Sequence, residues 1–221
     1  MSELRTDEEQ VEMLKRWWDE NGKGLLVAVI LVAGGWGGWN FYQENQRKTG
    51  EAAANIYQEL MTSVGELDAK PSDAVRTEAT ALAEQLKSDF GGTVYSQFAS
   101  LTLARIAAEK GDMDSAITEL QAVKAADTAP FKYLASYRIG MLLIEKQDYD
   151  KALAEVASIP EGAEAYKSQY LEVRGDALML KGDEAKARQA YLDAIDAAKL
   201  TGQDTRVLKR KADYLASSED A

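Results

Sequence analysis

Neither cysteine nor histidine occurs among the 221 residues of this chain. Their absence excludes disulfides, Cys/His zinc sites, thiol nucleophiles and Ser-His-Asp triads. Only chemistry based on Ser, Lys or paired carboxylates stays open, and no residue cluster in the sequence indicates it. The sequence therefore predicts a protein that is not an enzyme and uses no metal or other cofactor.

Cationic residues are in the minority, with 26 Lys and Arg against 37 Asp and Glu, which gives a net charge of −11. Nucleic-acid binding needs a clustered basic face, because the phosphate backbone dominates the affinity. The sequence therefore predicts no nucleic-acid partner.

Charge is missing altogether between Lys23 and Glu44, and within this gap Leu25–Ala33 is an unbroken apolar run. At about 1.5 Å per residue, a helix over residues 24–42 spans about 28 Å, close to a hydrocarbon core about 30 Å thick. The acidic segment before the gap and the lack of a small-x-small site after Tyr42 argue against a cleaved signal peptide. We expect a single, retained transmembrane helix over 24–42.

The distribution of cations around this helix predicts its orientation. Cytoplasmic flanks carry more Lys and Arg than flanks on the other side. Four cations precede the helix and two follow it closely: Arg5, Lys15, Arg16 and Lys23, then Arg47 and Lys48. The N-terminus is thus expected in the cytoplasm and, in a bacterium, the C-terminal domain in the periplasm, with the helix crossing the inner membrane.

The segments on either side of the anchor are predicted from their patterns. In residues 1–23 Val11, Leu14 and Trp18 recur at spacings of three and four, which indicates a cytoplasmic amphipathic segment. A fully solvated helix is an equally open interpretation. Residues 43–50 are expected to be a linker.

The anchor carries small residues at helical spacing. Gly34 and Gly38 form a G-x-x-x-G pair, and Ala33 with Gly37 extends the same face. Such a face lets a second helix approach closely in lipid. The alternative is that glycine is simply common in membrane helices. We expect Ala33, Gly34, Gly37 and Gly38 to form a membrane helix contact.

The rest of the chain reads as all-α. Only three prolines occur, and the sequence after residue 50 is rich in helix-forming residues without strand-like alternation. A pattern of two helices and a tight turn recurs about 35 residues apart, close to the tetratricopeptide repeat period of about 34. Its first helices carry Ala104, Gly140 and Gly175, its turns Gly111-Asp112, Gln147-Asp148 and Gly182-Asp183, and its second helices Ala116, Ala152 and Ala187.

These positions define a tetratricopeptide-repeat-like helical solenoid after the single N-terminal transmembrane helix. The small residues are expected where the two helices of a hairpin approach each other. The predicted domain covers 51–203, with a degenerate first helix pair over 51–90 and repeats at about 97–130, 133–166 and 168–201. Residues 204–221 are predicted to be a C-terminal capping helix and tail, with Val207, Leu208, Lys211 and Leu215 covering the open end.

The whole organisation resembles a known family. The short helix ending in Leu14–Lys23, above all Arg16-Trp17-Trp18 and Glu20-Asn21-Gly22-Lys23, the Gly/Trp-rich anchor and a repeat domain of this size are similar to the YfgM family. These are bacterial inner-membrane proteins described as ancillary subunits of the Sec translocon. The resemblance implies a periplasmic repeat domain, association with the SecYEG channel and pairing with the membrane-anchored periplasmic chaperone PpiD.

A partner groove is predicted from the repeat phase. In such solenoids the first helix of each pair lines the inner surface. Several of its side chains are alternatively ordinary core, covered by neighbouring helices. The candidates are Phe98, Leu101, Arg105, Leu134, Tyr137, Met141, Ile144, Glu172, Asp176 and Met179.

We therefore expect a membrane-anchored periplasmic adaptor of the translocon that binds a PpiD-like chaperone and assists secretory client chains. The alternative is a general envelope scaffold that recruits other membrane or periplasmic complexes through the same groove.

Overall fold

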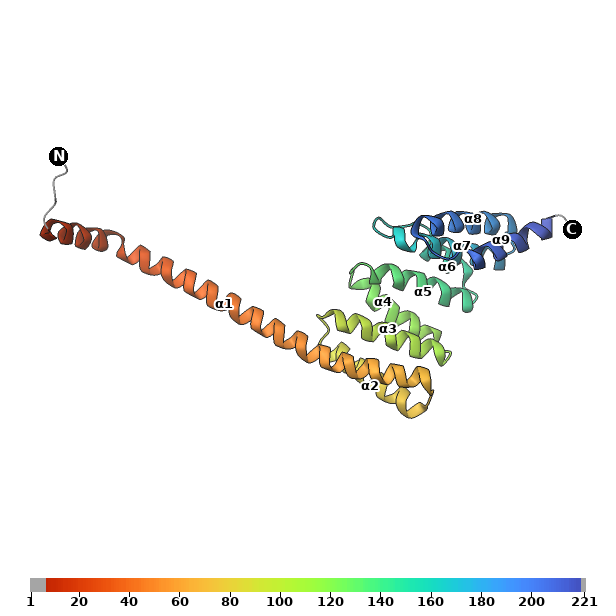
Figure 1. Cartoon of the computed structure of the whole chain (residues 1–221), viewed down its shortest axis with the longest axis horizontal. Coiled ribbons are helices and arrows are strands. Elements are labelled where there is room, and N and C mark those ends of the chain that lie inside the picture. The colour runs from red at the N-terminus through yellow and green to blue at the C-terminus, as the bar shows by residue number, and fades with distance from the viewer. Residues whose placement is uncertain (1–6, 220–221) are drawn as a thin grey trace. The chain divides into compact units, whose positions relative to one another are not determined.

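The computed structural model describes residues 7–219, and every regular element within them is a helix (Figure 1). This confirms the all-α fold class predicted from the sequence. The chain divides into two compact units, Met1–Ala52 and Ala53–Ala221. Arg5, one of the cations counted before the anchor, and the last two residues of the predicted tail lie outside the described residues.

The first unit contains most of helix α1, which runs from Asp7 to Ala69. Its apolar stretch is long and apolar enough to cross a membrane, and none of it is buried in the protein. Ile30 and Val32, for example, are 68% and 72% exposed. Exposure of an entire apolar segment is unlike the core helix of a soluble protein, and it is the arrangement expected when lipid supplies the apolar surroundings.

Residues 43–50, which were predicted to be a linker, are helical and continue α1 without a break. Arg47 donates to Glu44 at 2.8 Å and to Glu51 at 2.6 Å, one helical turn away on either side. Such pairs stabilise an exposed helix, and no proline interrupts it. The segment predicted before the anchor is likewise helical from Asp7 onward.

The second unit is a stack of helical hairpins that follow one another in chain order (Figure 1). Neighbouring helices pack together, and the first helix α5 also contacts the first helices α3 and α7 of the adjacent hairpins. After the end of α1 the elements are α2 (Asp73–Asp89), α3 (Val94–Glu109), α4 (Met113–Ala125), α5 (Phe131–Glu145), α6 (Tyr149–Glu155), the 3-10 helix η1 (Glu164–Tyr166), α7 (Lys167–Leu180), α8 (Glu184–Thr201) and α9 (Arg206–Glu219).

The turns within the hairpins have the geometry that their residues favour. Gly111 and Gly182 adopt φ values of 79° and 85° in the left-handed region, where glycine carries no steric penalty. Gln147 occupies the corresponding position at φ 63°, a conformation that costs more for a residue with a side chain. Asp112 and Asp183 then accept hydrogen bonds from the backbone amides of Ser115 and Lys186 and so cap α4 and α8.

The small residues of the repeat lie where helices approach most closely. A Cβ atom added to Gly140 would lie 2.8 Å from Cγ1 of Val173, and one added to Gly175 would lie 2.5 Å from Cε1 of Tyr191. Ala116, Ala152 and Ala187 are fully buried on the second helices. Gly140 thus faces α7 of the next hairpin, and Gly175 faces the second helix of its own hairpin, so a larger side chain at either position would force its neighbour to shift.

Ion pairs recur between successive hairpins at the repeat period. Lys146 at the end of α5 pairs with Asp114 in the first turn of α4, and Lys181 at the end of α7 pairs with Asp150 in the first turn of α6. Surface pairs of this kind contribute about 0–1 kcal/mol each, so the apolar packing carries most of the stability.

Helix α9 closes the C-terminal end of the stack. Leu208, Ala212 and Leu215 are buried in one cluster with Tyr191 and Ile195 of α8. Val207, which the sequence placed on the same covering face, is instead 47% exposed. The covering face of α9 is therefore narrower than predicted.

Candidate partner-binding groove

A hollow of about 300 Å³ lies between the first helices of two successive repeats, α3 and α5. Buried Ala104 and Leu120 contribute to it, while Met141 is 48% exposed. Charged side chains complete its lining. The full set is Ala104, Arg105, Ala108, Glu109, Leu120, Arg138, Met141, Leu142 and Glu145. We name it the Met141 hollow.

The charges around the Met141 hollow are not equivalent. Arg105 donates to Glu109 at 2.7 Å and also pairs with Asp68 near the end of α1. The hydrogen bond from Arg105 lowers the pKa of the Asp68 carboxyl. By contrast, Arg138 and Glu145 take part in no ion pair with the described residues, 7–219. These two charges on α5 are therefore available to a partner that enters the hollow.

Arg105 and Met141 are thus the two predicted groove residues that the structure brings together in one hollow. Four other candidates belong to the apolar core. Leu101 is only 9% exposed, and Phe98, Leu134 and Ile144 pack against the same cluster. The ring of Phe98 lies between those of Tyr57 and Phe131, at centroid distances of 5.2 and 5.0 Å. For these residues the alternative of ordinary core describes the structure better.

Tyr137 and Met179 are half-buried. Tyr137 packs against the cluster of Val156, Tyr170 and Val173, and burial raises the pKa of its hydroxyl. Met179 packs beside the buried cluster of α8 and α9, with its sulfur 3.8 Å from the Tyr191 hydroxyl. Both side chains therefore pack mainly against the apolar core.

The acidic candidates Glu172 and Asp176 are engaged within the protein by the terminal helix. Nζ of Lys211 on α9 donates to Glu172 at 2.8 Å and to Asp176 at 2.7 Å. Tyr191 also donates to Asp176, at 2.7 Å. Burial alone would lower the pKa of Lys211, but its bonds to Asp176 and Glu172 outweigh burial and raise it. The acidic end of the predicted groove is therefore closed by an internal cation.

The small residues of the anchor remain open. A Cβ atom added to Gly34, Gly37 or Gly38 would meet no atom of the described chain within 4 Å. Their backbone is accessible to another helix, as the predicted contact requires.

Known proteins share this combination of a membrane anchor and helical repeats. A family model for a tetratricopeptide repeat-like domain matches residues 15–217, which include the anchor as well as the hairpins. A protein of Escherichia coli named ancillary SecYEG translocon subunit is 31% identical over 86% of this chain and 88% of its own length. The chain belongs to the YfgM family.

Two further relatives have the same name and match over a similar share of the chain. The protein of Haemophilus influenzae is 29% identical over 85% of this chain and 88% of its own length. That of Neisseria gonorrhoeae is 22% identical over 95% of this chain and 97% of its own length. No solved structure matches the chain significantly.

Proposed function

We propose that this YfgM-family chain is a non-catalytic adaptor of the Sec translocon, anchored in the inner membrane, that holds a PpiD-like periplasmic chaperone beside the SecYEG channel. The observation that carries the proposal is the shared organisation. The relative of Neisseria gonorrhoeae, named ancillary SecYEG translocon subunit, aligns over 95% of this chain, and the family model spans residues 15–217, which contain both the anchor and the repeats. An adaptor needs a membrane segment and a partner surface, and the chain has a candidate for each.

The anchor supplies the first contact of the proposed function. Four cations before it and two after it favour a cytoplasmic N-terminus and a periplasmic repeat domain. The face formed by Ala33, Gly34, Gly37 and Gly38 packs against a helix of the channel.

The repeats supply the second contact. The apolar walls of the Met141 hollow accept an apolar side chain of the chaperone, and the free charges of Arg138 and Glu145 pair with charges of opposite sign beside it. Tethering in the membrane raises the local concentration of the two partners to the millimolar range, so that a weak groove is occupied. Secretory client chains pass close to the same surface.

In-cell photocrosslinking tests this function. A photoreactive amino acid at Met141 should crosslink to the chaperone, and one at Gly34 should crosslink to a SecYEG subunit. The matched control is Val207, which is exposed to nearly the same extent as Met141 but lies on α9. Mass spectrometry then identifies the products.

Crosslinks from Met141 and Gly34 to another envelope complex would instead support the alternative, a general scaffold. Equal products from Met141 and Val207 would contradict a role for the Met141 hollow.

A further inference from the structure

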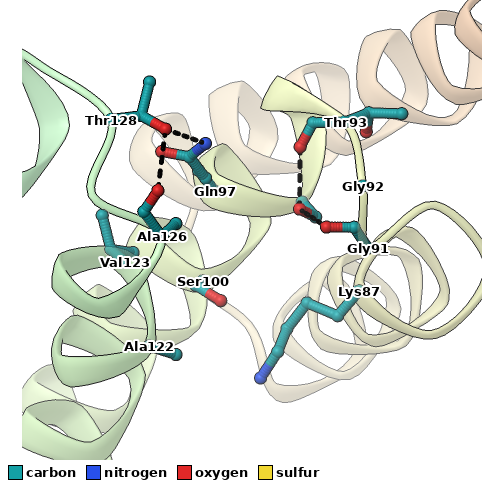
Figure 2. Close-up of a pocket in the computed structure, with 11 residues that line it drawn as sticks. Lys87, Gly91, Gly92, Thr93, Gln97, Ser100, Ala122, Val123, Ala126 and Thr128 are labelled. Carbon is teal, nitrogen blue, oxygen red and sulfur yellow. Dashed lines mark hydrogen bonds between the residues drawn. The ribbon is translucent and has the colours of Figure 1, made fainter.

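A second pocket, of about 400 Å³, shares no lining residue with the Met141 hollow. Figure 2 shows this second pocket. It is bounded by the connection between α2 and α3, by one face of α3 and by the C-terminal part of α4. We name it the Gln97 pocket. Its lining is Lys87, Gly91, Gly92, Thr93, Ser96, Gln97, Ser100, Ala122, Val123, Ala126 and Thr128.

The next repeat shows what occupies the corresponding space. Gln97 precedes Ala104 by as many residues as Tyr133 precedes Gly140, so Tyr133 is its counterpart. Tyr133 is only 6% exposed, and its hydroxyl donates to the carbonyl of Glu161 at 2.7 Å. The same hydroxyl lies against Gly162, the counterpart of Ala126. In the second repeat the ring of Tyr133 therefore fills the space that corresponds to the Gln97 pocket of the first repeat.

The third repeat closes this position as well. The counterpart of Gln97 there is Ser168, which is 5% exposed and donates to the carbonyl of Ala194 at 2.9 Å. In the first repeat Nε2 of Gln97 instead donates to the hydroxyl of Thr128 at 3.3 Å, and the shorter side chain leaves a pocket beside Ala122 and Ala126.

Two polar groups in the Gln97 pocket lack partners. Oε1 of Gln97 is buried and accepts no hydrogen bond from residues 7–219. The hydroxyl of Ser100 likewise has no hydrogen bond to the described chain, and Figure 2 shows it directed into the pocket. By contrast, Thr93 and Ser96 donate to backbone carbonyls of the α2–α3 connection. A buried acceptor without a donor is costly unless a ligand or water supplies one.

The pocket also lacks a free charge. Lys87 donates to both carboxylate oxygens of Glu119 at 2.6 Å, so its cation is neutralised. Small apolar side chains, Ala122, Val123 and Ala126, form the wall contributed by α4 and its C-terminal cap. A flat, neutral ligand with one polar end matches this combination, whereas an anion does not.

We propose that the Gln97 pocket binds the side chain of a tyrosine presented by a partner polypeptide, in the place that Tyr133 takes within the second repeat. The ring packs on Ala122, Val123 and Ala126, and the phenol donates to Oε1 of Gln97 while it accepts a hydrogen bond from the hydroxyl of Ser100. Tyrosine suits such a site because it joins a large apolar ring to a polar tip. The site is separate from the Met141 hollow and does not depend on which protein occupies that hollow.

Three capped tripeptides test the proposal: acetyl-Gly-Tyr-Gly-amide and its Phe and Leu analogues. Their binding to the full-length chain in detergent micelles is measured by saturation-transfer NMR. We expect the Tyr peptide to bind about threefold to tenfold more tightly than the Phe peptide, the range that one hydrogen bond provides. The Leu peptide should bind more weakly still.

A larger side chain at position 97 that fills the pocket should weaken the binding of the Tyr peptide. Gln97→Tyr introduces the residue found in the second repeat, and we expect it to reduce the Tyr-peptide signal at least about fivefold. Gln58→Tyr is the matched control, because Gln58 is exposed on α1 and does not line the pocket. Circular dichroism confirms that each variant is folded.

Ser100→Ala keeps the test decisive if Gln97→Tyr fails to fold. This variant should reduce the preference for Tyr over Phe to less than about twofold. Equal binding of the Tyr and Leu peptides, an unchanged signal in folded Gln97→Tyr, or an unchanged preference in Ser100→Ala would overturn the proposal. None of these outcomes bears on the crosslinks from Met141 and Gly34, so the two proposals fail independently.

Discussion

Lys211 on α9 bonds to Asp176 on α7, with Nζ 2.7 Å from Oδ1 and 2.9 Å from Oδ2. The same ammonium group bonds to Glu172 and lies 5.5 Å from the centroid of the Tyr191 ring. One cation of the terminal helix therefore neutralises both carboxylates on α7. The contact fixes α9 on the stack through charge as well as through Leu208 and Leu215.

Lys211→Ala should destabilise the repeat domain. It leaves Glu172 and Asp176 close together without a cation, and we expect a loss of about 1–2 kcal/mol after allowance for their partial exposure. Urea unfolding at neutral pH, followed by circular dichroism, measures this loss. Lys209→Ala removes an exposed lysine from the same helix and should change the free energy of unfolding by less than about 0.5 kcal/mol. Equal effects of the two variants would argue against the contact.

The stabilisation by Lys211 should disappear in alkali. The pKa of Lys211 is raised in the folded protein above its ordinary value of about 10.4. The stabilisation is therefore fully present below about pH 10 and is lost as the pH rises through the raised value. The difference between wild type and Lys211→Ala in urea unfolding should narrow above that pH and stay constant between pH 7 and 9.

Gly140→Ala and Gly65→Ala should have opposite effects, although both place a methyl group on a helical glycine. At Gly140 the added atom would lie 2.8 Å from Val173, so overpacking should cost about 1–3 kcal/mol. At Gly65 nothing lies within 4 Å, and the better helix propensity of alanine should stabilise by about 0.5–1 kcal/mol. Thermal unfolding of both variants measures the two signs. If Gly140→Ala melts at or above the wild-type temperature, the phase assigned to the repeats is wrong.

Asp204 at the start of α9 should make stability sensitive to acid. Its hydrogen bonds from the side chain and backbone of Arg206 lower the pKa of the carboxyl to about 2. A depressed pKa gives stability that is present above the ordinary value of about 3.9 and is lost as the pH falls toward 2. Asp204→Asn should therefore lower the unfolding midpoint at pH 5 and converge with wild type near pH 2. Asp213→Asn, on the exposed side of α9, is the control.

Val29→Arg should release the chain from membranes. Val29 is 56% exposed in the middle of the apolar run, and a central arginine costs about 2.5–3.5 kcal/mol in insertion. Asn45→Arg, just beyond the anchor, should leave the protein bound. Alkaline carbonate extraction followed by immunoblotting separates the two outcomes. Retention of Val29→Arg in the membrane fraction at the wild-type level would contradict a spanning helix.

The sequence was sufficient to predict the helical hairpins because their determinants are local. Gly140 and Gly175 recur at the repeat period, which predicts that neighbouring helices approach closely there. Gly111 and Gly182 recur in the turns, where they adopt positive φ. The apolar anchor is equally local. A period and a composition identify both features without knowledge of tertiary contacts.

The exposure of the groove could not be predicted in the same way. Phe98 and Leu101 have the repeat positions of surface residues, but rings and helices from neighbouring hairpins cover them. The contact of Lys211 with Asp176 joins residues far apart in the sequence, so no local pattern reveals it. The continuous helix over 43–50 carries side-chain pairs around Arg47, which the prediction of a linker did not specify. The sequence did not predict the Gln97 pocket, although a comparison of Gln97 with Tyr133, its counterpart in the next repeat, could have indicated it.

Purification of the full-length chain from native membranes tests the central claim most directly. An affinity tag at the chromosomal locus keeps expression at its natural level, and a mild detergent preserves membrane complexes. We predict that SecYEG subunits and a membrane-anchored periplasmic chaperone are recovered with the chain, and that Val29→Arg loses the channel subunits. Recovery of the wild-type chain without SecYEG subunits would contradict the account.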